Sequence, residues 1–177
     1  MVHVNDAILI NRAPVLALWA SVVAERLGYN NDEALSLGKA VCGLNAQSKG
    51  RRLGIYKPQE KGAEGGEKAP AAEEVELMGR HIPVARTEDG LRAVCGGRPV
   101  SSESIERYFE SKFGDSLPAV RAAMTKLAQS FPPAELAARA FALYEMFRPV
   151  IPDGVRGWGV KGKLDLGLIK RLAATTP

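Results

Sequence analysis

The sequence predicts a mainly α fold: a multi-helix bundle around a buried N-terminal helix at residues 13–28, with a small β-hairpin or three-stranded ribbon at residues 75–95 on its side. Ala13–Ala24 carries no charge and has Ser21 as its only polar residue, so a helix there would be buried on several faces. At about 18 Å, that helix would be too short to span a bilayer. Four later segments repeat apolar residues at helical spacing on one side only, and residues 75–95 combine short apolar runs with turn residues.

The first two helices are predicted to meet at a tight junction. Gly28 is suited to end the first helix because glycine adopts the left-handed conformation found at helix C-termini. Asn31 or Asp32 is suited to cap the second helix, which we expect to fray near Gln47–Gly50.

The β segment follows a change in composition. Pro58–Ala72 contains Gly, Ala, Pro, Glu and Lys but no large apolar side chain, which predicts a flexible linker or a long exposed loop. Thr87–Gly90 is a favourable turn because Gly90 can adopt a positive φ. The expected strands are Val75–Met78, Ile82–Arg86 and Leu91–Cys95.

The rest of the chain is predicted to be helical and to complete a single domain over residues 1–177. Residues 1–57 are too few to bury the apolar helix alone, so we expect them to pack across the linker against the C-terminal helices. The expected C-terminal helices are Ser102–Phe113, Ser116–Ser130, Pro133–Arg148 and Asp165–Ala174, while Ala7–Ile10 is predicted as an extended lead-in or a first helical turn.

Charge and cysteine content favour a cytoplasmic protein with an anionic partner. The net charge is +4 and the isoelectric point is about 9.2, which favours partners such as nucleic acid over cationic ones. Cys42 and Cys95 have no CxxC spacing, and two reduced thiols are favoured over one disulfide. The residues before the apolar run include Asp6 and lack the positive charge of a signal peptide, so we expect no secretion signal and no membrane partner.

Motifs for metal, cofactor or nucleophilic chemistry are not recognisable in the sequence. The only histidines, His3 and His81, are far apart, and there is no HExxH, EF-hand loop or GxSxG. Cys42 lies close to an apolar helical stripe, which favours a buried structural thiol over a nucleophile. We therefore expect no metal, no cofactor and no catalytic residue that can be named.

The glycine-rich segment Gly157–Lys163 resembles a phosphate-binding loop in part. Its spacing fits both GxGxxG and the first seven positions of a P-loop, but Leu164 stands where a P-loop needs Ser or Thr. Pro149–Asp153 is also a proline-broken connection in place of the required strand. A looser phosphate-binding loop followed by a helix N-terminus stays open beside a simple connection anchored by Trp158.

The junction of the first two helices loosely resembles the helix–turn–helix group of DNA-binding proteins. Ala24, Gly28 and Ala34 have the spacing of the small residue, the turn glycine and the buried apolar residue of that motif. A recognition helix presents Arg, Lys, Asn or Gln near its start, whereas this helix presents Asp32 and Glu33, which would repel DNA. An ordinary helix–helix junction is therefore favoured.

Two basic segments are the candidate binding site. Cations placed next to an aromatic ring suit a phosphate backbone with a stacked base, although a short basic run is also typical of a solvated loop. The candidate residues are Lys49, Arg51, Arg52 and Tyr56 in the first segment and Arg156, Trp158, Lys161 and Lys163 in the second.

Three functions follow, in order of preference. The first is a small binding or regulatory protein that docks nucleic acid or a phosphorylated ligand through its basic glycine-rich segments. The second is a protein–protein interaction module without catalytic activity. The third is an enzyme with a site assembled around Arg148, Asp153, Arg156 and Trp158.

Overall fold

The computed structural model is mainly helical, which confirms the predicted fold class. It describes residues 7–52, 73–88, 90–95, 98–150 and 161–174. The expected linker at residues 58–72 lies outside the described residues. Within the described part, no helix is long and apolar enough to cross a membrane. The helices are α1 (Arg12–Arg26), α2 (Asn31–Arg52), α3 (Ser102–Phe113), the 3₁₀ helix η2 (Gly114–Ser116), α4 (Leu117–Gln129), α5 (Pro133–Phe147) and α6 (Leu166–Ala174).

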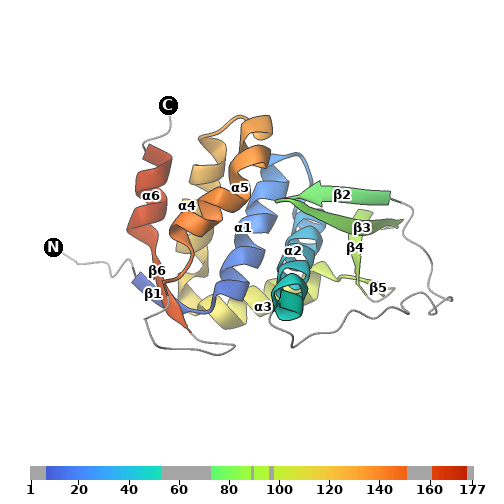
Figure 1. Ribbon diagram of the computed structural model, residues 1–177, viewed down its shortest axis with the longest axis horizontal. Coiled ribbons are helices and arrows are strands. Elements are labelled where there is room, and N and C mark those ends of the chain that lie inside the picture. The colour runs from blue at the N-terminus through green and yellow to red at the C-terminus, as the bar shows by residue number, and fades with distance from the viewer. Residues whose placement is uncertain (1–6, 53–72, 89, 96–97, 151–160, 175–177) are drawn as a thin grey trace.

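Helix α1 is buried along most of its length. Every residue from Pro14 to Ala24 is buried, and α1 contacts α2, α3, α4 and α5. Figure 1 shows α1 between α2 on one side and α4 and α5 on the other. The indole Nε1 of Trp19 donates to the Ala140 carbonyl at 2.9 Å. This bond satisfies the one polar atom of a side chain that is otherwise closed off from water.

Helices α1 and α2 pack antiparallel at very close range. A Cβ on Gly38 would lie 2.6 Å from the Ala17 carbonyl oxygen and 2.8 Å from the Ser21 nitrogen, so only glycine fits there. One turn further along α2, the Cys42 thiol donates to the Ala13 carbonyl at 3.5 Å. An antiparallel pair of this kind is not the steep crossing of a helix–turn–helix motif.

The start of α2 differs from the expected cap. The Asn30 side chain accepts from the Glu33 backbone at 2.9 Å, and the Glu33 carboxylate accepts from the Asn30 backbone at 3.1 Å. This reciprocal capping box places the N-cap at Asn30, before the expected Asn31 or Asp32. At its other end α2 continues to Arg52, so the residues from Ser48 to Arg52 are helical and do not fray as expected.

A four-stranded antiparallel sheet of order β2-β3-β4-β5 lies beside α2 (Figure 1). The turn expected at Thr87–Gly90 joins β3 to β4, a further turn joins β2 to β3, and Gly79 and Gly90 both have a positive φ. Val84 and Ala93 are cross-strand partners and are fully buried. The strands are β2 (Glu73–Leu77), β3 (Arg80–Thr87), β4 (Gly90–Cys95) and β5 (Arg98–Pro99).

A second sheet joins two distant parts of the chain and was not predicted. Strand β1 (Ala7–Ile10), expected as an extended lead-in or a first helical turn, is extended and pairs antiparallel with β6 (Gly162–Asp165), where no strand was expected. Ile10 and Leu164 on the inner face are buried in the common core. Both strands lie at the edge of the helical body, next to α6 (Figure 1).

Candidate anion-binding surface

Two arginines, Arg12 and Arg148, place their positive charges close together where α1 begins and α5 ends. The Arg12 Nε donates to the Pro149 carbonyl at 2.9 Å, and Arg148 is the C-cap of α5. Partial burial lowers the pKa of the Arg12 guanidinium, and the positive charge of Arg148 lowers this pKa further. Neither arginine forms an ion pair within the described residues.

The N-terminus of α1 is itself electropositive. Its N-cap, Asn11, makes no side-chain hydrogen bond, and its first turn contains no acidic residue. A helix N-terminus favours negative charge, so Arg12 stands where a cation is disfavoured. Arg148 at a helix C-terminus is favourable because a cation there is stabilised by the helix dipole. Arg12 also has a structural role, since it donates to the Pro149 carbonyl. No described carboxylate forms an ion pair with either arginine.

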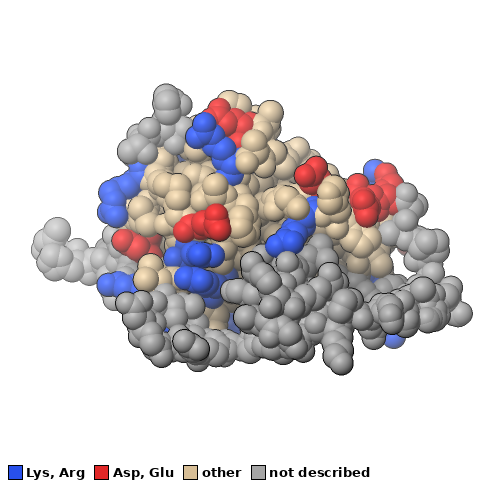
Figure 2. Space-filling model, viewed as in Figure 1, with Lys and Arg blue, Asp and Glu red and all other residues tan. Residues whose placement is uncertain are grey.

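Two lysines of the second basic segment lie next to these arginines. Val150 and Lys163 exchange two backbone hydrogen bonds of 3.0 Å, and Val150 directly follows the Pro149 carbonyl that Arg12 contacts. Lys161 and Lys163 are exposed. Figure 2 shows basic side chains over the lower end of α5 and beside β6, with acidic side chains next to them. We call Arg12, Arg148, Lys161 and Lys163 the basic end.

Exposed aliphatic side chains flank Lys163. Leu9 on β1 is paired with Lys163, and Val150 is paired with it on the other side. Directly opposed residues of antiparallel strands project from the same face, so these three side chains form one row. Leu9 is 70% exposed and Val150 is 68% exposed. The face is therefore both basic and apolar.

Gly162 allows this arrangement because it removes a side chain from a close backbone contact. A Cβ at this position would lie 2.7 Å from the Val150 carbonyl oxygen. The glycine at the end of the predicted phosphate-binding loop thus has a packing role. The helix expected at Asp165–Ala174 is present as α6 and begins one residue later, at Leu166, directly after β6. Asp165 caps α6, accepting from the Leu168 backbone at 3.2 Å.

The other predicted site residues are placed in part. Lys49, Arg51 and Arg52 belong to the C-terminal end of α2, and their side chains lie outside the described residues. Tyr56, Arg156 and Trp158 also lie outside them. Because Cys42 contacts the start of α1, the remainder of α2 runs past that point toward the end of the molecule where the basic end lies (Figure 1).

A basic–aromatic cluster between α2 and α3 was missed. Lys39 and Lys112 place their Nζ atoms 5.4 Å and 6.0 Å from the centroid of the Tyr108 ring. Burial raises the pKa of Tyr108 to about 12, and the nearby Cys42 thiol adds to this effect. The i, i+4 spacing of Tyr108 and Lys112 was a signal for a helical surface pair, but Tyr108 was assigned to the apolar stripe.

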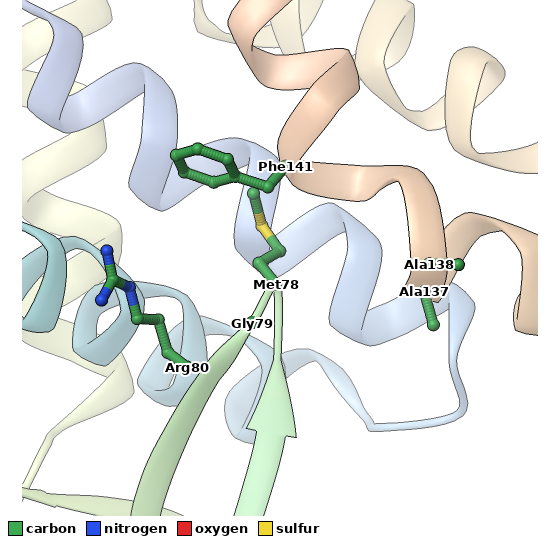
Figure 3. Close-up of a pocket in the computed structure, with 6 residues that line it drawn as sticks. All are labelled: Met78, Gly79, Arg80, Ala137, Ala138 and Phe141. Atoms are coloured by element: carbon green, nitrogen blue, oxygen red, sulfur yellow. The ribbon is translucent and has the colours of Figure 1, made fainter.

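An open cleft of about 280 Å³ lies between the β2–β3 turn and α5 (Figure 3). Its wall is formed by Met78, Gly79, Arg80, Ala137, Ala138 and Phe141. Met78 has a positive φ of 53°, which is unusual for a residue with a long side chain. Figure 3 shows Arg80 extending away from the two alanines. The wall contains no carboxylate, imidazole, hydroxyl or thiol that could act on a ligand.

We searched the described residues for a metal site and compared the chain with known proteins. Among the described side chains, no group of three or more His, Cys, Asp and Glu is arranged to hold a metal ion. Comparisons with protein-family models, curated proteins and solved structures find no match to this chain.

Proposed function

We propose that this chain is a binding protein that docks an anionic, phosphate-bearing partner, with nucleic acid favoured, at the basic end. The observation that carries the proposal is the closeness of Arg12 and Arg148: Arg12 donates to the carbonyl of Pro149, the residue after Arg148, and neither arginine forms an ion pair within the described residues. Like charges held together cost free energy, and an anion that binds between them would recover it. Lys161 and Lys163 extend the same positive surface.

The shape of the surface favours an extended polyanion over a small ligand. Its cations come from the start of α1, the end of α5 and strand β6, and they follow an outer face. A row of separate cations suits successive phosphates along a backbone, whereas a single phosphate needs convergent donors.

The finer architecture is also a proposal: we infer that the helices assemble around α1 as the central helix of one domain. The contacts of α1 with four other helices support this. A reducing, cytoplasmic location is proposed as well, and the free thiol of Cys42 is compatible with it.

A binding titration at several salt concentrations tests the function. Fluorescence anisotropy would measure the affinity of the wild-type chain for a labelled oligonucleotide. Each lysine–phosphate contact contributes about 0.9 to the slope of log K against log salt for duplex DNA and about 0.7 for a single strand. The K161Q/K163Q variant should therefore reduce the slope by about 1.4 to 1.8 and leave the fold intact, because both side chains are exposed.

A matched control separates local from overall charge. Lys126 is exposed near the end of α4, and its conversion to Gln removes a cation that does not belong to the basic end. K126Q should bind like the wild-type chain. Equal loss of affinity in K126Q and in a single K163Q variant, or no salt-dependent binding by the wild-type chain, would refute the proposal.

A second candidate is docking of another protein at the same face. Leu9, Val150 and Met146 are the large apolar side chains that are exposed within the described residues, and Met146 lies in the last turn of α5 close to Arg148. Exposed aliphatic groups between cations would suit an acidic partner with apolar side chains. Binding that survives nuclease treatment and is lost on L9S/V150S substitution would favour this alternative.

A further inference from the structure

Tyr108 presents an aromatic ring between two cations on the surface formed by α2 and α3. The Nζ atoms of Lys39 and Lys112 approach the ring centroid at 5.4 Å and 6.0 Å. Lys112 is exposed, and Tyr108 and Lys39 are half-buried. Neither lysine forms an ion pair within the described residues. Both ammonium groups are carried on flexible stems, so they can move from the ring to a phosphate.

Tyr108 on α3 and the start of α1 lie in the same part of the molecule, because α3 contacts both α1 and α2. The Cys42 thiol of α2 donates to the Ala13 carbonyl at the start of α1. Ala13 is next to Arg12, whose carbonyl accepts from the Tyr144 hydroxyl at 3.4 Å. Figure 1 shows α3, the start of α1 and the end of α2 along one edge of the molecule.

We propose that the partner of the basic end is single-stranded nucleic acid, and that one unpaired base stacks on Tyr108. This proposal rests on the function proposed above and assigns the class of partner. Lys39 and Lys112 would hold the phosphates on either side of that base, and the strand would continue past the start of α1 toward Arg148 and Lys163. An aromatic platform with flanking cations is the arrangement that binds single strands without sequence preference.

A duplex fits this surface less well. Its bases are stacked on each other and expose only their edges in the grooves, so the face of a tyrosine ring on the protein surface gains nothing from them. A polyanion without bases would likewise contact the lysines and arginines but not the ring. The tyrosine is therefore the residue that distinguishes a single strand from other polyanions.

Competition among three probes tests the proposal. The wild-type chain would be titrated with a labelled single-stranded oligonucleotide, with its duplex form and with heparin, which is a polyanion without bases. The single strand should bind most tightly. Tyr108→Leu, which keeps apolar bulk but removes the aromatic ring, should weaken single-strand binding about 5- to 150-fold, the range measured for loss of one stacked base. The same variant should leave heparin binding unchanged.

Tyr108→Phe serves as the matched control because it keeps the ring and removes only the hydroxyl. It should bind the single strand like the wild-type chain, and both variants should show the wild-type thermal transition. Unchanged single-strand affinity in Tyr108→Leu, or equal wild-type affinity for duplex and single strand, would overturn the assignment of the partner. If heparin still bound in a salt-dependent way, the proposed anion binding at the basic end would be supported. If none of the three probes bound, both proposals would be refuted.

Discussion

The two β-sheets are attached to one helical body in opposite ways. The four-stranded sheet uses consecutive strands joined by short turns, and α2 holds it through side chains. Ser36 donates to the Val100 carbonyl and accepts from the Ala93 backbone, both at 2.9 Å. The two-stranded sheet pairs β1 with β6 from far along the chain and is held by backbone contacts around Gly162. Polar side chains therefore attach the four-stranded sheet, whose strands are consecutive in the chain. Close backbone packing attaches the two-stranded sheet, whose strands are far apart in the chain.

Strands β2 and β1, each at the edge of its sheet, also differ in their charge. Strand β2 carries Glu73, Glu74 and Glu76 on exposed positions, and Figure 2 shows acidic side chains at that end of the molecule. Charges on an edge strand oppose pairing with other chains. Strand β1 has the sequence Ala-Ile-Leu-Ile and carries no charge. The exposed charges of β2 therefore oppose pairing with other chains, whereas β1 has no charge and Lys163 on β6 lies between the exposed Leu9 and Val150.

The largest effect is expected from breaking the attachment of the four-stranded sheet. Ser36→Ala would leave the Ala93 nitrogen and the Val100 oxygen without their partner, which should lower the free energy of unfolding by about 2–3 kcal/mol. Chemical denaturation measures this change. Ser104→Ala, at an exposed position, is the control and should cost far less. The affinity of the folded variant for a polyanion should stay at the wild-type value, because Ser36 contacts Ala93 and Val100 and no residue of the basic end.

Breaking the attachment of the two-stranded sheet should affect binding as well as stability. Gly162→Ala forces the new methyl group against the Val150 carbonyl, and overpacking of this kind costs about 2 kcal/mol. The displaced Val150–Lys163 pairing should also weaken oligonucleotide binding. Gly43→Ala is a matched control because its Cβ would meet nothing within 4 Å, and it should be neutral or stabilising. Wild-type affinity in G162A would show that β6 does not present the lysines.

The smallest effect concerns the pH dependence of the link between α2 and β4. Hydrogen bonds from the Leu91 and Asn30 backbones lower the pKa of Glu33 below its ordinary value of 4.5. The stabilisation is therefore complete above that ordinary value and is lost as the pH falls through the lower, folded-state pKa. Glu33→Ala should cost about 1 kcal/mol at neutral pH, the usual cost of a lost cap.

Glu33→Gln provides the control for this titration. Glutamine can keep the capping geometry but has no charge to titrate. Unfolding experiments between neutral and acidic pH should show a smaller loss of stability in this variant than in the wild-type chain. An identical pH profile for the two would assign the acid sensitivity to other carboxylates.

The sequence predicted those elements whose signals are local. Helix α3 has the expected bounds, Ser102–Phe113, because its cap and its apolar stripe both lie within one segment. Strands β2, β3 and β4 follow from alternation and from turn glycines, whereas β5 (Arg98–Pro99) was not predicted. Strands β1 and β6 were missed because neither shows which segment it pairs with, and a four-residue run such as Ala7–Ile10 fits a helical turn equally well.

The candidate site was predicted to a smaller extent. Lys161 and Lys163 were selected from the sequence because they lie in a basic, glycine-rich segment. Arg12 was not selected, since its position beside Arg148 depends on the packing of α1 against α5. The grouping of Lys39 with Tyr108 similarly requires α2 and α3 to meet. Charges that gather from separate elements leave no pattern in the linear order of residues.

The pairing of β1 with β6 also determines when the molecule can be complete. Strand β1 is among the first described segments to be synthesised, but its partner is made only when the chain has reached Asp165. Until then Leu9 and Ile10 have no strand to pair with, and closing a loop of this length is a late and entropically costly step. The surface proposed to bind nucleic acid is therefore assembled last, so the chain should acquire its binding activity only on completing its fold.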